Sequence, residues 1–221
     1  MTTLDDTKTE PTSAVEPDQG GGMPSSRDRI VSPYSFKEKV GRVLWSVVQL
    51  TVFRWSFHDW YRLRNMLLRL FNAKVAPTAR LRATVYIEIP WNLTVGDNSI
   101  VGDRAILYCL GPVTIGDHVV VSQYAHLCAG SHDFTRPDLP LLRPPIRVGD
   151  DVWIAADAFV GPNVTVGEGA LLGARASAYT DLEPWTIYGG NPARPIKTRP
   201  RFATDTLRAS TSFDVRRARE T

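Results

Sequence analysis

The chain is poor in the residues on which disulfide-bonded and metal-dependent proteins rely. It has only two cysteines, Cys109 and Cys128, and four histidines in 221 residues. Two cysteines without a C-x-x-C spacing give neither a disulfide framework nor a thiolate zinc site, so we expect a reducing, cytoplasmic compartment. A Gly-rich phosphate-loop motif is also missing, so nothing favours the binding of a nucleoside triphosphate.

Charge of one sign is not in large excess either. The 26 basic and 23 acidic side chains give a formal net charge of +3, and no basic stripe follows the repeats described below, so no nucleic-acid partner is expected. Residues 1–32 are rich in Thr, Ser, Pro, Gly and acidic residues and lack the apolar core of a signal peptide, which predicts a disordered leader. Residues 201–221 are expected to form a basic tail, to which we assign no function.

Aliphatic residues recur at a six-residue spacing in the second half of the chain, at positions Val148, Ile154, Val160, Val166 and Leu172. Four residues after each of them stands a small or β-branched residue: Val152, Ala158, Val164, Ala170 and Ala176. An α-helix with a period near 3.6 would spread such residues around all of its sides. Hexads of this kind indicate short strands joined by tight corners into a solenoid.

The same frame extends towards the N-terminus through Ile115, Val121 and Leu127 and, earlier, through Val95, Val101 and Leu107, with a fainter start at Val75, Leu81 and Ile87. Three hexads make one triangular coil. The spacing from Leu107 to Ile115 is eight, so two residues around Gly111 and Pro112 are extra at one corner. The repeats predict an all-β solenoid domain over residues 75–200, because stacking is what buries each ring of aliphatic side chains.

Several stretches resemble the hexapeptide-repeat acyltransferases. They are PIRVGDDVWI (145–154), GPNVTVG (161–167) and GGNPARPIK (189–197). The last is similar to the acetyl-CoA-dependent sugar O-acetyltransferases of that family, and LGPVTIG (110–116) with GSHDF (130–134) resembles the exopolysaccharide enzymes known as colanic acid biosynthesis acetyltransferases. The resemblance implies that the parallel β-helix is left-handed, that acetyl-CoA is the co-substrate and that the acceptor is a sugar or a lipid-linked glycan.

Residues 33–74 precede the repeats and have a different character. An apolar stretch over residues 43–53 and a later aromatic-rich stretch are punctuated by Lys and Arg, which predicts an amphipathic helical segment that is too short to cross a bilayer. Two interpretations stay open. The segment caps the open end of the solenoid and packs against other subunits, or it makes peripheral contact with the cytoplasmic face of the membrane.

The repeat is interrupted once, where the chain leaves the coil after Ser131 and returns at Ile146 or Val148. A loop at 132–147 is long for a repeat array, and long loops in compact domains often carry function. His132 stands at its mouth, in the position of the family's general base, so the resemblance implies that His132 removes the proton of a sugar hydroxyl during direct transfer. On the alternative reading, His132 only forms a hydrogen bond within the loop.

The resemblance also implies a set of residues for acetyl-CoA. Trp153 and Ala156 stand in the family's Trp-Ile-Gly motif, with Ala155 where glycine is usual. Ala174 and Tyr179 are expected further along the same groove, and Arg194 and Lys197 are expected to contact the phosphates. The family implies a homotrimer whose active site lies between subunits.

Acceptor recognition is predicted less directly, from Asp133 and Phe134 in the loop and Tyr108 and Tyr124 on the coils. Two rival functions stay open: a metal-dependent hydratase of the γ-carbonic anhydrase type and a non-catalytic trimeric scaffold. A zinc site needs histidines that converge, but His118, His126 and His132 are eight and six apart, which departs from the spacing of that family, so no metal is expected. His58, His118 and His126 are expected to be surface or packing residues.

Overall fold

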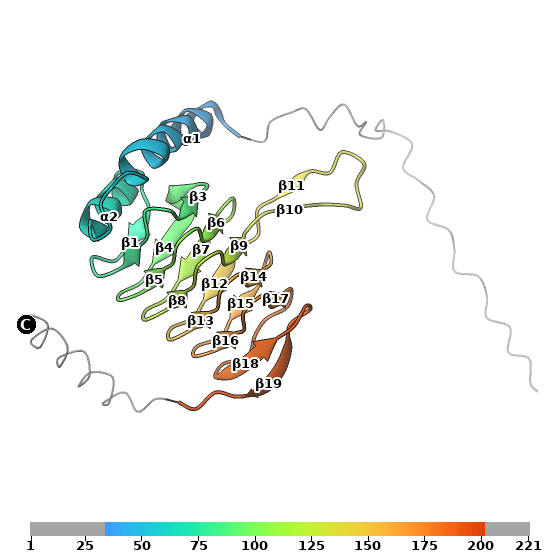
Figure 1. The fold of residues 1–221 in the computed structure, drawn as a ribbon. Coiled ribbons are helices and arrows are strands. Elements are labelled where there is room, and N and C mark those ends of the chain that lie inside the picture. The colour runs from blue at the N-terminus through green and yellow to red at the C-terminus, as the bar shows by residue number, and fades with distance from the viewer. Residues whose placement is uncertain (1–33, 202–221) are drawn as a thin grey trace, which may run out of the picture.

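The computed structural model describes residues 34–201, in which a left-handed parallel β-helix is covered at one end by helices (Figure 1). The prediction of an all-β solenoid with an N-terminal helical segment is confirmed. Each coil contributes one short strand to each of three parallel faces. Face A, in spatial order, comprises β1 (Lys74–Val75), β4 (Leu93–Val95), β7 (Val113–Ile115), β12 (Ile146–Val148) and β15 (Thr165–Val166).

The other two faces follow the same order of coils. Face B comprises β2 (Arg80–Leu81), β5 (Ile100–Val101), β8 (Val120–Val121), β13 (Trp153–Ile154), β16 (Leu171–Leu172), β18 (Thr186–Gly189) and β19 (Arg194–Thr198). Face C comprises β3 (Tyr86–Ile87), β6 (Ile106–Tyr108), β9 (His126–Cys128), β14 (Phe159–Val160) and β17 (Ser177–Ala178). A short 3-10 helix, η3 (Pro90–Asn92), fills one corner between faces C and A.

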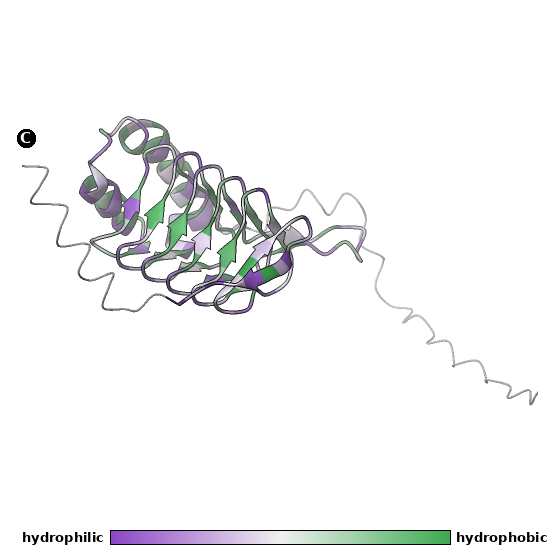
Figure 2. Cartoon of the chain, turned by 60° about the horizontal axis from the view of Figure 1, so that its bottom comes forward, coloured by the Kyte–Doolittle hydropathy of each residue, from purple (hydrophilic) through white to green (hydrophobic). Residues whose placement is uncertain are grey.

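The repeated aliphatic residues form the core because each is in register with its counterpart in the next coil. Val121 pairs with Ile154, which pairs with Leu172, and all three side chains are fully buried. Strands of two or three residues have no stability on their own, so the stacking of coils is what holds the fold together. Figure 2 shows the hydrophobic character concentrated on the strands of the solenoid.

The corners depend on residues in the left-handed region of the backbone. Asn98, His118 and Asp151 have φ values of 55 to 57° at successive A-to-B corners. The backbone N–H of His118 donates to the carbonyl of Asp97 at 2.8 Å, and that of Asp151 donates to Asp117 at 2.9 Å, so each corner is bonded to the one before it. Asn and Asp tolerate this conformation better than most residues.

The helical segment begins at a capping box. The Ser35 side chain accepts from the Glu38 backbone N–H, and the Glu38 side chain accepts from that of Ser35, which fixes the start of α1 (Phe36–Val48). The helix continues into the π-helical turn η2 (Gln49–Phe53), and α2 (Tyr61–Leu70) follows. No helix within residues 34–201 is long and apolar enough to span a bilayer.

One side of the helical segment seals the first coil. Trp45 is buried, packs edge-on against Phe53 with ring centroids 5.8 Å apart, and donates from Nε1 to the carbonyl of Ile87 at 2.7 Å. The Gln49 side chain accepts from the backbone N–H of Ile87 at 2.7 Å. These bonds satisfy the open backbone edge of β3, which water or another strand would otherwise occupy. The inner side of α1 is therefore a cap.

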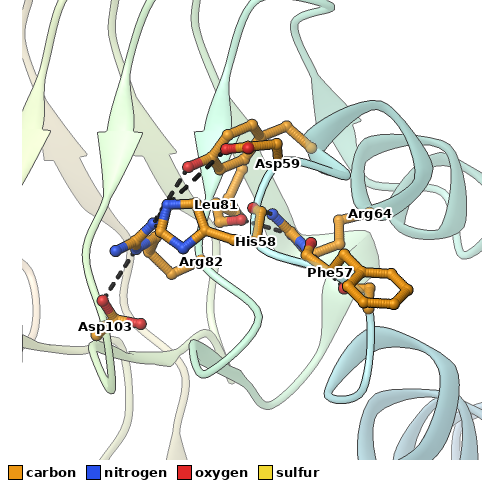
Figure 3. Close-up of polar contacts among 9 residues, drawn as sticks. Phe57, His58, Asp59, Arg64, Leu81, Arg82 and Asp103 are labelled. Atoms are coloured by element: carbon orange, nitrogen blue, oxygen red, sulfur yellow. Dashed lines mark hydrogen bonds and ion pairs between the residues drawn. The ribbon is translucent and has the colours of Figure 1, made fainter.

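Arg64 on α2 holds the turn between the two helices. Its side chain is fully buried and donates to the carbonyls of Leu81, Phe57 and His58 at 2.7 to 2.9 Å, and to the hydroxyl of Ser56 at 2.7 Å. Figure 3 shows the guanidinium within this turn, while Arg82, just after β2, bonds to Asp103 and lies against His58. His58 is thus part of a structural network.

Candidate active site

The candidate site begins where the chain leaves the solenoid at a corner between faces C and A (Figure 1). After β9 the chain runs out through β10 (Ser131–His132) and comes back through β11 (Leu141–Leu142), and the two strands pair antiparallel with His132 opposite Leu141. The return ends at β12, which starts at Ile146. We call residues 129–145 the excursion.

Gly111 lets the returning arm of the excursion cross the coil below it. A Cβ atom at Gly111 would lie 2.4 Å from the carbonyl oxygen of Pro144 and 2.5 Å from that of Arg143, closer than any real contact. The outgoing arm passes Gly130, where a Cβ would meet Leu110 at 2.8 Å. Glycine is required at Gly111 because two backbones approach closely there, whereas at Gly130 the neighbours are side-chain atoms. The corner with two extra residues is therefore the one that the excursion crosses.

His132 is exposed, and a backbone carbonyl fixes its ring. The Nδ1 atom lies 2.6 Å from the carbonyl oxygen of Leu139, in the tip of the same excursion. A carbonyl oxygen can only accept, so Nδ1 carries a proton, and in the neutral ring this tautomer leaves the lone pair on Nε2. Leu139 presents this carbonyl from a turn in which its φ is +46°. The bond therefore orients the ring and leaves Nε2 without a partner within the excursion, at the surface.

The two loop residues expected to bind the acceptor follow His132 directly in the chain but differ in their contacts. The Asp133 carboxylate accepts from the hydroxyl and the backbone N–H of Thr135, at 2.6 and 3.0 Å, and these bonds hold its pKa below the ordinary value. Asp133 therefore shapes the turn, whereas the Leu139 carbonyl orients the imidazole. Phe134 is 87% exposed and offers its ring to a ligand or a neighbouring chain.

Face C carries an aromatic row next to the excursion. The His126 ring packs edge-on against Tyr108 and Phe159, at centroid distances of 6.4 and 5.4 Å, and Phe159 lies 5.7 Å from Tyr179. Burial lowers the pKa of His126 and raises that of Tyr108. Within residues 34–201 the buried His126 Nε2 has no hydrogen-bond partner. Tyr108 lies next to Gly130 at the base of the excursion, where a Cβ on Gly130 would lie 3.2 Å from its ring.

Tyr124 and His118 lie away from the excursion. Tyr124 is at a B-to-C corner, where its hydroxyl accepts from Arg104 at 2.7 Å. His118 is exposed at an A-to-B corner, near Asn98. No group of three or more His, Cys, Asp or Glu side chains in the described part of the chain is arranged to hold a metal ion.

Face B aligns two of the residues expected to bind acetyl-CoA. Trp153 pairs with Leu171, Leu171 with Ile187, and Ile187 with Lys197, so these side chains share one row on the outer side of the sheet. Strands lie about 4.8 Å apart, so the backbone positions of Trp153 and Lys197 are roughly 14 Å apart, with Leu171 and Ile187 between them. Trp153 is 43% exposed and is held by a bond from Nε1 to the Ser122 hydroxyl at 3.0 Å.

Of the remaining residues expected to bind acetyl-CoA, only some lie beside this row. Ala156 and Ala174 are at successive B-to-C corners beside face B, whereas Ala155 is buried. Arg194 is exposed at the start of β19, opposite Gly189. Tyr179 ends face C, beside Phe159, so the structure does not bring it to the row that contains Trp153.

His132 and Trp153 lie on opposite sides of the same coil stack. Face B runs between the A-to-B and B-to-C corners, so the corner from C to A, which carries the excursion, is the vertex opposite to it. The base and the apolar row therefore do not meet within one chain. A site that uses both needs a second chain.

The sequence did not predict the contacts between the excursion and the start of the helical segment. Arg143 on the returning arm donates to Glu38 of α1 at 3.2 Å, and its guanidinium lies 4.5 Å from the ring centroid of Tyr34. Arg42 covers the other side of Tyr34 at 4.2 Å and pairs with Glu88. More than 100 residues separate Glu38 from Arg143, so no local pattern reveals this contact.

Comparison with known proteins gives close relatives for most of the chain. The acetyltransferases named WcaF, for colanic acid biosynthesis, from Escherichia coli K12 and Shigella flexneri are each 46% identical over 156 residues, which is 71% of this chain and 86% of theirs. The galactoside O-acetyltransferase of E. coli is 27% identical over 137 residues, 61% of this chain and 68% of that protein. No family model matches.

Solved structures share the fold. A galactoside acetyltransferase in complex with coenzyme A superposes with a TM-score of 0.70 at 22% identity and covers 81% of this chain and 92% of its own. A maltose O-acetyltransferase from Clostridium difficile has a TM-score of 0.68 at 22% identity, covering 76% and 90%. The chain belongs to the hexapeptide-repeat acyltransferases, in the sugar O-acetyltransferase branch that contains the colanic acid biosynthesis acetyltransferases.

Proposed function

We propose that this enzyme transfers an acetyl group from acetyl-CoA directly to a sugar hydroxyl of a glycan built in exopolysaccharide biosynthesis. The observation that carries the proposal is the bond from His132 Nδ1 to the Leu139 carbonyl, 2.6 Å long, which leaves Nε2 free as a base. The relatives act on sugars by their names, which sets the acceptor class.

The chemistry needs one proton carrier and no acyl-enzyme. His132 Nε2 takes the proton from the sugar hydroxyl as that oxygen forms a bond to the thioester carbon. The tetrahedral intermediate then expels the thiolate of coenzyme A, and the imidazolium returns the proton to that sulfur. One C–O bond forms and one C–S bond breaks, and His132 ends neutral. The Leu139 carbonyl stabilises the imidazolium in between, because it accepts from Nδ1–H in both states.

A homotrimer completes the site. His132 lies opposite face B in its own chain, so we place it against face B of a neighbour, where the outer row of β13, β16, β18 and β19 presents Trp153, Leu171, Ile187 and Lys197. The same row continues through Val120 and Ile100, which are 39% and 37% exposed. An exposed apolar row along a whole face is typical of a surface that another subunit covers.

Acetyl-CoA would lie along that row. The indole of Trp153 and the small side chains of Ala156 and Ala174 leave room for the pantetheine arm, while Lys197 and Arg194 supply positive charge for the phosphates. Acceptor contacts are proposed for Tyr108, Phe134 and Asp133 near His132. Tyr124 would act only if a neighbouring chain brought its corner to the excursion, and Tyr179 only from the far end of face C.

The acceptor is proposed to be a lipid-linked glycan and the enzyme to work in the cytoplasm, where acetyl-CoA is made. Two observations support this: the two cysteines are not bridged, and the names of the relatives place them in colanic acid biosynthesis. Metal-dependent hydration and a scaffold role are the rival functions. Against both stand the names of the relatives, which are acetyltransferases.

Isothermal titration of acetyl-CoA into metal-free protein tests the proposal, beside the His132→Ala variant. We expect both proteins to bind acetyl-CoA and only the wild type to acetylate a soluble sugar acceptor. Absence of acetyl-CoA binding by the wild type would contradict the acetyltransferase assignment. Equal transfer by both proteins would remove His132 as the base.

A further inference from the structure

The outer side of α1 is apolar and uncovered within the described chain. Its exposed residues are Phe36 (80% exposed), Val40 (43%), Val43 (64%), Leu44 (55%), Val47 (57%) and, in η2, Leu50 (69%). Their spacing of three and four residues places them on one stripe of the helix. We call these six side chains the outer stripe.

The outer stripe is distinct from the side that caps the solenoid. Trp45, Gln49 and Phe53 are buried against the first coil and lie on the opposite side of the helix. A helix that only capped the solenoid would carry polar residues outside, as amphipathic surface helices do. Here the second apolar side contributes nothing to the core, and exposed apolar area of this extent marks an interaction surface.

Positive charge borders the outer stripe. Lys37 and Lys39 are exposed on either side of it, and Arg54 is exposed beyond its end. Residues 34–73 contain seven Lys and Arg residues and only two carboxylates, Glu38 and Asp59. An apolar stripe between cationic side chains matches the layered chemistry of an anionic bilayer, which offers phosphates at its surface and acyl chains below.

Aromatic side chains continue the surface after η2. Trp55 is 84% exposed and Phe57 is 70% exposed, and Phe57 packs edge-on against the half-exposed Trp60 with ring centroids 4.9 Å apart. Tryptophan favours the headgroup level of a membrane because its ring is apolar with one polar edge. Two exposed tryptophans beside a cationic apolar helix therefore point to lipid as the occupant.

We propose that the outer stripe, with Lys37, Lys39, Arg54 and Trp55, docks the enzyme on the surface of an anionic lipid bilayer. A second copy of the chain fits less well, because a symmetric contact would bring the same cationic side chains together. Docking would also place the active site near the surface, since Glu38 of α1 is bonded to Arg143 of the excursion that carries His132. This binding goes beyond acetyl transfer and does not depend on it.

Flotation of the full-length protein with vesicles tests the proposal. We expect binding to vesicles of phosphatidylcholine in which roughly a third of the lipid is the anionic phosphatidylglycerol. We expect little binding to vesicles of phosphatidylcholine alone. High salt should weaken it. The double variant Val43→Glu and Val47→Glu should lose about tenfold or more in affinity, because burial of even one valine is worth about a factor of ten. Lys37→Glu with Lys39→Glu should also weaken binding.

The matched control adds the same two carboxylates elsewhere. Thr114→Glu with Thr165→Glu changes exposed positions on face A and should bind vesicles as the wild type does. Failure of the wild type to bind anionic vesicles, or undiminished binding by the Val43/Val47 variant, would overturn the proposal. A change in oligomeric state in that variant, without vesicle binding by the wild type, would assign the stripe to a contact between copies.

Transfer of acetyl groups to a soluble sugar acceptor separates this proposal from the proposed function. The Val43/Val47 variant should keep that activity while it loses vesicle binding, because neither residue lies in the candidate site. If no protein transfers acetyl groups but the wild type still binds anionic vesicles through the outer stripe, the proposed function fails and the docking surface stands.

Discussion

His132 illustrates how a single carbonyl can set the chemistry of a side chain. Because Leu139 accepts from Nδ1, replacement of the ring by an amide should keep the loop bond and lose the base. We expect His132→Ala and His132→Asn each to lower kcat by about 10²- to 10⁴-fold, with acetyl-CoA affinity unchanged by titration. Substantial activity in His132→Asn would show that the residue braces the loop and does not carry the proton.

The identity of this residue could be predicted from the sequence, but its tautomer could not. His132 stands out because the repeat stops there. The partner of Nδ1 is a backbone atom seven residues later, presented by a turn in which Leu139 has a positive φ. Leucine rarely adopts that conformation, so no residue type signals it. Likewise, Asp133 next to His132 in sequence gave no guide, since its carboxylate binds Thr135 instead.

A substitution of Arg64 gives a second test at the residue scale, and it tests stability, not catalysis. Its guanidinium satisfies four acceptors of the turn before α2 and of β2. Arg64→Met keeps much of the side-chain volume but orphans these acceptors, so we expect a loss of about 3 kcal/mol in the free energy of unfolding. Urea denaturation measures it. The exposed neighbour Arg62→Met is the control, with a change within about 0.5 kcal/mol.

The excursion depends on the helical segment at the scale of whole elements. Arg143 joins its returning arm to Glu38 and Tyr34, so loss of that contact should leave His132 less well placed. We expect Arg143→Gln to lower kcat several-fold while the KM for acetyl-CoA stays the same, because Arg143 contacts Glu38 and Tyr34 and is not among the residues proposed to bind acetyl-CoA. Arg136→Gln, which breaks only the loop's own pair with Asp138, is the control.

A reversed-charge pair sharpens that test. Glu38→Arg should lower kcat in the same way, and the double variant Glu38→Arg with Arg143→Glu should recover part of the loss, because the two charges can pair again. The same KM for acetyl-CoA in the wild type and all of these variants would show that Arg143 acts by positioning His132. A rise in KM for acetyl-CoA with no change in kcat would contradict that role.

The strands of the solenoid could be predicted because the six-residue spacing fixes which side chains point inward. Val148, Ile154 and Val160 each had to point inward once three hexads were assigned to a coil, and each is buried. The antiparallel arms β10–β11 and β18–β19 break that repeat and could not be predicted in this way. The contact of α1 with the excursion depends on where the cap meets the first coil, which no periodicity encodes.

At the scale of the molecule, the triangular cross-section decides what one chain can do alone. The corner that carries His132 faces away from face B, so under the proposed mechanism the His132 of one chain and the row that contains its own Trp153 and Lys197 would serve two different sites. The family resemblance implies these residues as one set because they belong to one sequence pattern. Only the coil geometry separates them, which makes subunit sharing a testable consequence.

Two inactive variants should restore activity to each other when they assemble together. One carries His132→Ala, and the other carries Trp153→Ala with Lys197→Glu, which we expect to abolish acetyl-CoA binding. In a mixed homotrimer each site takes its base from one chain and its groove from the next, so a trimer that holds both variants has one intact site in three and should show about one third of wild-type activity. Co-expression with two different affinity tags and purification through both tags provides the mixed enzyme.

Each variant purified alone is the control, and both should be inactive. Mixing the two after assembly should give no activity until the subunits exchange, because complete homotrimers of either kind contain no intact site. A mixed enzyme as inactive as its parents would mean that each chain holds its own complete site. That outcome would require the excursion to bend across the coil to face B, which the crossing at Gly111 opposes, since Arg143 and Pro144 already lie against its backbone.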